Sequence, residues 1–464
     1  MTNIFIFQVC RKWEIIDPLP LESVLFAPLY LVGILWLSVG LCVITEQLLC
    51  PALENVTHGV DPSFSSAIIF GAFTSSPALC ATLITSLTGP TSSSGVGAVV
   101  GGCLFNQTIC VAISILAAMR EELQLLPTLP SSYSRQRWVN VEPYSILRDL
   151  AAVAVAEIFV IYFTSDCDVS SLEAILLLSL YLLYSTICYI TSAAFDGGLN
   201  AELTTIEEAR LAAEGSPPKL KKPKKEMKVS LTSRTAVTEY TLSLMARPFE
   251  ELTGLIMKEK TIQKDSGDDS RKHHIRSLVI SLTLEALLVL MICIWSEKFG
   301  CLTGLTPFTV GVIFVGTSCS MPTLLISRAL ATQSSTADTQ SFQLAEVQRR
   351  GTDLAAALSN SLGSNVFTLL VGLGLPWLFL SCSSRHSSSS QSLSATINDP
   401  FTAAEGEDDD LSFSLWILLG SLGFLSLILL GRGWEQGLPD VRLHFGLYAV
   451  CMALLIFHDM RFVV

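Results

Sequence analysis

The sequence predicts an all-α, polytopic membrane protein with about ten transmembrane helices arranged as two inverted five-helix repeats. The composition is the first observation: 50% of the 464 residues are hydrophobic and only 15% are charged, whereas soluble proteins carry about 25% charge. The second is a set of ten apolar segments, each close to the roughly 20 residues that cross about 30 Å of hydrocarbon. The third is a Pro-containing phrase that occurs once in each half of the chain.

The ten expected spans fall in two groups of five. They lie near residues 24–45, 64–88, 95–118, 146–165, 172–194, 276–298, 306–331, 353–382, 412–431 and 442–460. Residues 1–23 form an N-terminal segment that makes a poor signal peptide, because its basic residues follow its short apolar stretch. The first repeat covers 24–195. The second covers 276–382 and 412–464, on either side of a Ser-rich, then acidic linker at 383–411.

The segment 196–275 between the two groups is expected to be a cytoplasmic loop. More than half of the 29 Lys and Arg residues lie between Arg210 and Arg276, and basic loops favour the cytoplasmic face. The short basic loops near Arg120, Arg350 and Arg432 fall on the same face when the spans are counted. Five is an odd number, so the second half enters the membrane from the opposite face, which is the topology of an inverted repeat.

The repeated phrase supports this duplication. "SSPALCATLITS" begins at Ser75 in the second span, and "SMPTLLISRALA" begins at Ser320 in the seventh. The third and eighth spans then carry a second matched pair, "GGCLFN" from Gly101 and "GSNVFT" from Gly363. Both pairs occupy the same order in their halves.

Polar residues around each Pro predict two half-sites that meet near the membrane midplane. Pro removes a backbone hydrogen bond and interrupts a helix, so we expect helix breaks at Pro77 and Pro322. Unwound carbonyls and nearby hydroxyls provide oxygen ligands for small cations in secondary transporters. The expected cation-binding positions are Ser75, Ser76, Ala78, Thr82 and Asn106 in the first repeat, and Ser320, Thr323, Ser364, Asn365 and Thr368 in the second. Close helix packing is the alternative explanation for such small residues.

With these residues in place, the chain resembles the potassium-dependent sodium/calcium exchangers of the cation/calcium exchanger superfamily. The resemblance includes "CPALENV" after the first span, "GVGAVVGGCLFN" in the first repeat, "RDL" at the fourth span and "LGSNVF" in the second repeat. It implies both termini on the non-cytoplasmic side and a midplane site that alternates between the two faces. It also implies exchange of sodium for calcium together with potassium.

The chain departs from this family at the residues that bear charge. The resemblance implies Glu after the first Pro, Asp after the second and Asp after the second Phe, where this chain has Ala78, Thr323 and Thr368. Calcium prefers six to eight oxygen ligands, several of them charged. Two acids inside expected spans, Glu157 and Glu285, are candidates to compensate.

Two functions from different classes therefore stay open. The first is a working cation antiporter, with monovalent cations alone as one variant. The second is a transport-incompetent relative that acts as a binding or regulatory membrane subunit. No phosphate-binding loop or catalytic triad appears, so we expect neither an enzyme nor a resident cofactor. The expected partners are membrane lipid and the small cations Na⁺, Ca²⁺ and K⁺, without nucleic acid. The sequence identifies neither a protein partner nor which membrane, plasma or organellar, holds the protein.

Overall fold

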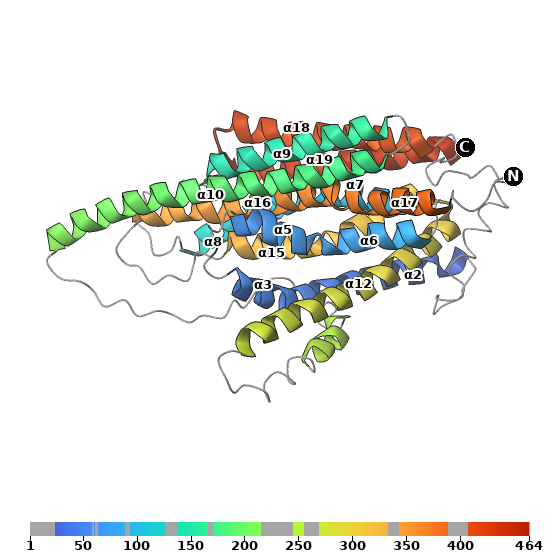
Figure 1. The fold of residues 1–464 in the computed structure, drawn as a ribbon, viewed down its shortest axis with the longest axis horizontal. Helices are drawn as coiled ribbons and strands as arrows, with labels where there is room; N and C mark the ends of the chain where they lie inside the picture. The colour runs from blue at the N-terminus through green and yellow to red at the C-terminus, as the bar shows by residue number, and fades with distance from the viewer. Residues whose placement is uncertain are drawn as a thin grey trace.

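The protein is an elongated bundle of helices. The computed structural model describes residues 24–57, 60, 64–88, 93–125, 138–165, 170–214, 245–254, 269–332, 343–387 and 407–463. The helices run along the long axis of the bundle (Figure 1). In this view α9, α18 and α19 form one edge, α2, α3 and α12 form the other, and the Pro-containing segments lie between them.

The first half contains five membrane-crossing segments. Their elements are η1 (Val24–Phe26), α2 (Ala27–Ile44), the π-turn η2 (Thr45–Leu49) and α3 (Cys50–Val56); η3 (Ser65–Phe70), α5 (Gly71–Thr74) and α6 (Ser76–Thr88); α7 (Ser94–Phe105), η4 (Asn106–Cys110) and α8 (Val111–Leu125); α9 (Pro143–Thr164); and α10 (Ser171–Glu214). A short strand, β1 (Trp138–Asn140), precedes α9.

The second half repeats this plan. Its elements are α12 (Asp269–Thr303); α13 (Pro307–Val310), η6 (Gly311–Gly316), α14 (Thr317–Cys319) and α15 (Met321–Ala331); α16 (Gln343–Leu370) and α17 (Gly374–Ser387); α18 (Glu407–Gly431); and α19 (Leu438–Val463), preceded by β2 (Glu435–Gly437). The π-turn η3 opens the second crossing segment of the first half, and the π-turn η6 lies near the start of the second crossing segment of the second half.

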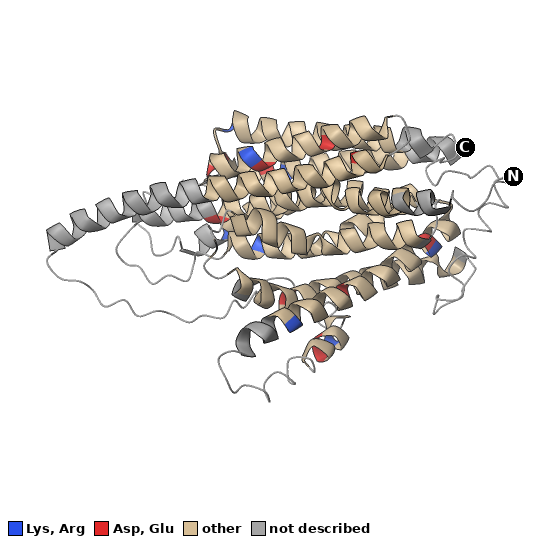
Figure 2. Ribbon diagram, viewed as in Figure 1, with Lys and Arg blue, Asp and Glu red and all other residues tan. Residues whose placement is uncertain are grey.

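The expected spans agree with these helices. Nine helices in the described part of the chain are long and apolar enough to cross a membrane. The remaining expected span, near 146–165, is α9, which is 22 residues long but carries Arg148, Asp149 and Glu157. Charged residues are few along the rest of the described helices, as the blue and red segments of the ribbon in Figure 2 show. The chain is therefore an all-α, multi-pass membrane protein with five crossing segments in each half.

The segment 196–275 is partly helical. Helix α10 continues to Glu214 and α12 begins at Asp269, while 215–244 and 255–268 lie outside the described residues, as does 388–406 of the linker. Residues 245–254 include a further helix that lies against α2: Trp36 Nε1 donates to Met245 O (3.1 Å), and the rings of Trp36 and Phe249 are 5.0 Å apart. Part of the central segment therefore packs on the bundle.

A two-stranded ribbon connects the two halves. Strands β1 and β2 pair antiparallel, with Trp138 opposite Gly437 and Asn140 opposite Glu435. Strands of three residues give no periodicity to detect, and the sequence analysis did not predict them. The ribbon joins the loop after the third crossing segment to the loop after the ninth.

Candidate functional site

Each Pro-containing segment is interrupted at one residue. Ser75 (φ −92°, ψ −1°) separates α5 from α6, and Ser320 (φ −90°, ψ −4°) separates α14 from α15. Each interruption lies two residues before its Pro. Pro77 has no N–H to donate, and the hydroxyl of Ser76 donates to Phe73 O instead (2.8 Å). The two expected helix breaks therefore occur at matching positions.

The two interrupted segments contact each other's repeat. Ser75 Oγ donates to Ser364 O (3.2 Å), and Ser320 Oγ donates to Gly102 O (3.3 Å). Ser75 and Ser320 are equivalent in the repeated phrase, and so are Gly102 and Ser364 in the second motif. Each repeat therefore contributes one half of each contact, as two inverted half-sites require.

Glycines allow the helices to approach closely at this crossing. A Cβ atom on Gly101 would lie 2.1 Å from Val312 O, and a Cβ atom on Gly363 would lie 2.1 Å from Ala67 O. Gly101 and Gly363 are equivalent in the repeats, and so are Val312 and Ala67, which lie at the same distance before their Pro residues. The matched glycines are therefore required by backbone-to-backbone packing, which brings the hydroxyl groups together.

The hydroxyl of Ser364 is the centre of the resulting cluster. It lies 2.8 Å from Thr74 Oγ1 and 3.3 Å from Thr323 Oγ1, and it donates to Gly71 O (3.2 Å). Thr74, Thr323 and Ser364 are all buried. Three crossing segments thus supply neutral oxygen atoms to one buried location.

Two amide side chains extend the cluster. Asn106 Nδ2 donates to Asn365 Oδ1 (3.0 Å), and Asn365 Nδ2 donates to Cys103 O (3.1 Å). Cys110 donates from its thiol to Asn106 Oδ1 (3.4 Å). Asn106 is the first residue of the π-turn η4, a type of insertion that often occurs at functional sites.

The two intramembrane acids occupy different surroundings. Glu285 is 1% exposed, and its carboxyl oxygens lie 3.3 Å from Thr45 Oγ1 and 3.2 Å from Ser76 Oγ. Glu157 is fully buried and accepts from Gln107 Nε2 (2.5 Å). Glu285 therefore contacts an expected site residue directly, whereas Glu157 contacts the residue that follows one.

The comparisons with known proteins identify the family. The sodium/calcium exchanger protein family matches residues 30–190 and 273–457, which is well over half of the chain. The chain belongs to the sodium/calcium exchanger protein family. It is accordingly an integral, multi-pass membrane protein, and the members of its family are cation transporters and not enzymes. A search of curated proteins finds no match.

Solved exchanger structures resemble this exchanger at low sequence identity. The H⁺/Ca²⁺ exchanger CAX is 12% identical, with a TM-score of 0.50 over 99% of this chain and 92% of that chain. The sodium-calcium exchanger NCX_Mj, soaked with 10 mM Na⁺ and no Ca²⁺, is 14% identical, with a TM-score of 0.42 over 93% of this chain and 99% of that chain. The CAX likeness is one of fold.

The structure brings together some of the positions expected from the exchanger's sequence and separates others. Ser75, Ser364 and Thr323 belong to one bonded cluster, and Asn106 bonds to Asn365. Ala78, in contrast, belongs to an apolar cluster that includes Val315 and Cys319. Thr82 bonds to Leu79 O of its own helix (2.9 Å), and Thr368 is buried. Cation binding at these positions stays a prediction.

The sequence analysis did not single out several polar residues that bond to the candidate acids. Gln107 bonds to Glu157 and accepts from Ser421 Oγ (2.6 Å), and Thr45 bonds to Glu285. Two consecutive amides within a span, Asn106 and Gln107, were the available signal. Ser421 is one Ser among several in an apolar helix, and no pattern distinguishes it from the others.

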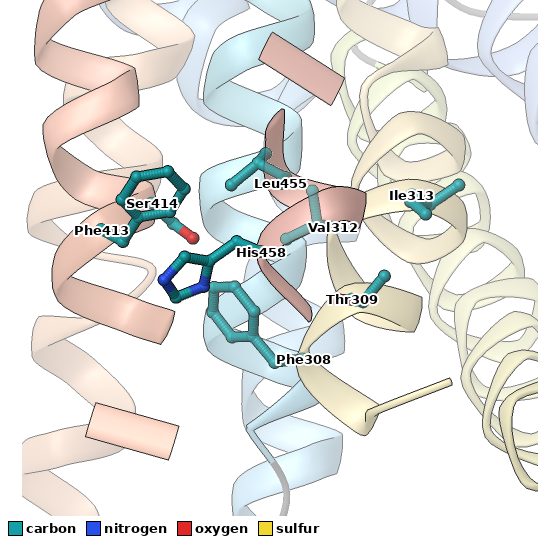
Figure 3. A pocket seen from close by; sticks show the side chains of 8 residues that line it. All are labelled: Phe308, Thr309, Val312, Ile313, Phe413, Ser414, Leu455 and His458. Atoms are coloured by element: carbon teal, nitrogen blue, oxygen red, sulfur yellow. The ribbon is translucent and has the colours of Figure 1, made fainter. Parts of the chain in front are cut away.

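The described residues hold no metal centre of the His, Cys and carboxylate type. They contain no group of three or more His, Cys, Asp or Glu side chains that could hold a metal ion. A pocket between α13, α18 and α19 is lined by Phe308, Thr309, Phe413 and His458 among others (Figure 3). His458 stacks on Phe413 at 4.1 Å between ring centroids. This mainly apolar pocket differs from the oxygen-rich central cluster.

Proposed function

We propose that this exchanger transports a small monovalent cation, sodium in the first place, through the central cluster. The observation that carries the proposal is the contact between Ser76 Oγ and Glu285 (3.2 Å). It supports the proposal because Ser76 is an expected site residue, and because the positions at which the family resemblance implies acids are Ala78, Thr323 and Thr368.

Charge balance favours a monovalent cation over calcium. One carboxylate neutralises one positive charge, whereas a calcium ion beside the same carboxylate would keep one uncompensated charge in a low-dielectric interior. Moving an uncompensated charge from water into the protein interior costs much free energy. Hydroxyl, amide and backbone carbonyl oxygens can complete the shell of a monovalent ion, but calcium usually takes several charged ligands. We therefore expect sodium transport with little sodium-driven calcium exchange.

Ion flux in proteoliposomes tests this function. Radioactive sodium and calcium uptake would be measured with sodium, calcium and potassium varied one at a time on the opposite side. We expect sodium uptake well above calcium uptake, and we expect Glu285→Gln to lower sodium uptake by about tenfold, equivalent to about 1.4 kcal/mol. Calcium uptake that matches sodium uptake and is unaffected by Glu285→Gln would overturn the proposal.

A matched control exists on the same helix. Glu297 follows Glu285 in α12 and accepts a hydrogen bond from Ser94 Oγ (3.1 Å), away from the central cluster. Glu297→Gln removes the same charge from the same helix. We expect this variant to keep sodium uptake within about twofold of the wild type, a difference under ~0.5 kcal/mol.

A second candidate function is a binding or regulatory subunit without transport. The contact that favours it is the direct hydrogen bond between Asn106 and Asn365 (3.0 Å). Because this bond occupies the side-chain oxygen of Asn365, that oxygen is not free to bind a cation. This candidate predicts no flux of any of the three cations in the same proteoliposomes.

A further inference from the structure

We propose that a second copy of this chain covers the outer side of α2 and α12, and that helix 245–254 lies at the centre of the contact. The proposal concerns an interface between copies, so it does not depend on which cation the central cluster carries. It assigns a role to a helix of the central segment that lies outside both repeated motifs.

Helix 245–254 is attached to α2 by its apolar face. Ala246 and Phe249 are buried and form one apolar cluster with Val43 of α2. Leu288 of α12 packs against the same cluster. The ring of Phe249 lies over Gly40, where a Cβ atom would be 2.4 Å from the ring. The helix is therefore packed closely on both α2 and α12.

The polar contacts of this helix place it beside the middle of a membrane-crossing segment. Trp36 Nε1 donates to Met245 O (3.1 Å), and Thr253 Oγ1 donates to Gln47 Oε1. The apolar span that contains Trp36 and Gln47 is Ala27–Leu53. At 1.5 Å per residue, these two contacts lie about 14 Å and about 9 Å inside the two ends of the span. Helix 245–254 is thus at membrane depth.

The opposite face of the helix carries exposed charged residues. Arg247, Glu250 and Glu251 are all exposed, and none of the three forms an ion pair with a described residue. Figure 2 shows blue and red segments on this short helix, which lies below α12 in that view. Ionised side chains at membrane depth are costly against lipid, and they almost always face protein or a water-filled cavity. This charged face therefore requires a cover other than lipid.

The neighbouring acid on α2 does not neutralise this face. Glu46 interacts electrostatically with Glu250 and with Arg328 of α15. Glu46 and Glu250 carry the same charge, so their interaction adds to the cost of the exposed face. Arg328 already provides an opposite charge for Glu46. The face needs a partner that brings charges of its own.

The charges on this face are complementary to a second copy of themselves. Two copies in one membrane keep the same orientation, so the twofold axis between them runs along the membrane normal. The two copies of helix 245–254 then run parallel, with each residue at the depth of its counterpart. Glu250 and Glu251 lie within about 6 Å of Arg247 along the helix axis. A long arginine side chain covers this distance, so Arg247 of each copy reaches an acid of the other.

The second acid of each copy lies nearer to water. Two acids against one arginine leave one negative charge per copy. The helix runs from the level of Trp36 to the level of Gln47 on α2, so Glu251 lies closer than Arg247 to the end of the span. The paired charges are thus the deeper ones, where an unpaired charge costs most.

Subunit counting in a membrane tests the proposal. Full-length protein fused to one fluorescent protein would be inserted at low density into lipid vesicles, and the bleaching steps of each particle would be counted. We expect two steps for most wild-type particles. A single step for most wild-type particles would overturn the proposal and would leave the proposed transport function untouched.

Charge reversal shows whether the dimer uses this face. Arg247→Glu brings like charges together across the axis, and so does Glu250→Arg combined with Glu251→Arg. Since like charges across an interface are strongly unfavourable, we expect each variant to weaken dimerisation by at least about tenfold. The two variants are complementary to each other, so their co-expression with different fluorophores should restore two-step particles that contain one copy of each.

The rescue by mixing distinguishes an interface from a defect within one chain. A defect within one chain would persist when the variants are mixed. The control Arg120→Glu reverses an exposed arginine near the end of α8 and should remain dimeric. Dimers that persist in both interface variants contradict the proposal, as do folded variants that mixing does not rescue.

Photo-cross-linking covers the case in which the charge variants do not fold. Pro248 is exposed on the charged face, and a photo-reactive phenylalanine analogue in its place should link two full-length copies. The same analogue in place of Leu427, which is 71% exposed on α18 at the other edge of the bundle, should link none. A cross-link from position 248 to lipid, to a different protein or to the same chain would identify another occupant and overturn the proposal.

Discussion

Ser364 illustrates how single residues join the two repeats. Its hydroxyl contacts Thr74 of the first repeat and Thr323 of the second, at 2.8 Å and 3.3 Å, while its carbonyl accepts from Ser75 (3.2 Å). The equivalent position in the first repeat is Gly102, which offers only its carbonyl, to Ser320. The two half-sites thus make equivalent backbone contacts. They differ in side-chain oxygens, because Ser364 on α16 has a hydroxyl group and Gly102 on α7 has none.

Restoring the acids that the family resemblance implies should increase calcium binding. Thr323→Asp would place a carboxylate next to Ser364 Oγ, now 3.3 Å from Thr323 Oγ1, and Ala78→Glu would add another from the first repeat. Each adds a charged oxygen ligand in a low-dielectric environment. We expect the double change to raise calcium affinity by about tenfold, or about 1.4 kcal/mol, and to exceed the sum of the single changes. Adding Thr368→Asp should then introduce potassium dependence.

Calcium binding and folding must be measured together for these variants. Ala78 lies in an apolar cluster with Val315 and Cys319, where an unpaired Glu destabilises the protein. Ser86→Glu adds an acid to the same helix, α6, beyond the central cluster, and serves as the control for charge alone. If Ser86→Glu raises calcium affinity as much as the double change, local ligation is not the cause.

Sequence motifs located part of this site because the duplication repeats spacing. The matched phrases predicted helix breaks at Pro77 and Pro322, and the structure has them two residues earlier, at Ser75 and Ser320. They could not predict the contact between Gln107 and Ser421, which are separated by 314 positions in the chain, because no sequence pattern encodes such a pairing. The sequence also could not predict that Ala78 lies in an apolar cluster, because alanine occurs on both polar and apolar faces of a helix.

At the scale of elements, the crossing of α7 with η6 and of α16 with η3 determines the geometry of the site. Both crossings depend on glycines that leave no space for a side chain. Hydropathy alone placed the spans near their observed positions, because the requirement for about 20 apolar residues is insensitive to detail. The apolar pattern did not predict the extension of α10 to Glu214 or the π-turns, because it records neither a polar continuation of a helix nor a local change in helical hydrogen bonding.

Alanine at the matched glycines should destabilise the protein and disrupt the site. A Cβ atom at either Gly101 or Gly363 would lie 2.1 Å from a backbone oxygen of the facing helix, and backbone cannot move aside cheaply. Overpacking of this kind costs about 1–3 kcal/mol. We expect Gly101→Ala and Gly363→Ala each to lower the Tm and to weaken sodium binding, as measured by thermal unfolding with and without sodium.

The same substitution elsewhere provides the control. Gly420 on α18 has open space for a methyl group, because no heavy atom of the described residues lies within 4 Å of its Cβ position. Gly420→Ala should leave the Tm unchanged or raise it slightly, because Ala favours helix over Gly. If Gly420→Ala lowered the Tm as much as Gly101→Ala, the helix crossings would be no more sensitive to an added methyl group than the rest of the bundle.

At the scale of the whole molecule, the two repeats differ in polarity next to the central cluster: the residues before the Gly motif are polar on α16 and apolar on α7. One turn before Ser364 on α16, Asn360 Nδ2 donates to Ser327 Oγ (2.8 Å), and Ser327 Oγ lies 3.0 Å from Ser361 Oγ. The positions of α7 equivalent to Asn360 and Ser361 are Ala98 and Val99. The polar contacts that continue from the cluster therefore lie between α15 and α16, and the equivalent positions of α7 are apolar.

The β1–β2 ribbon supports the inverted topology of the loops. The ribbon pairs the loop between crossing segments three and four with the loop between nine and ten. An even number of crossings separates these loops, which places them on one face, together with the central segment after crossing five. The linker after crossing eight then falls on the opposite face.

Epitope tags in the loops should report this topology. We expect a tag inserted within 215–244 to be accessible from the cytoplasm, and a tag within 388–406 to be accessible from the other side. A tag within 126–137 should also be accessible from the cytoplasm, because this loop contains β1 and lies on the same face as the ribbon. Selective membrane permeabilisation with antibody detection measures each tag. Because a single crossing more or fewer between the tags would reverse one of them, detection of both 215–244 and 388–406 from the same face would exclude the five-plus-five arrangement.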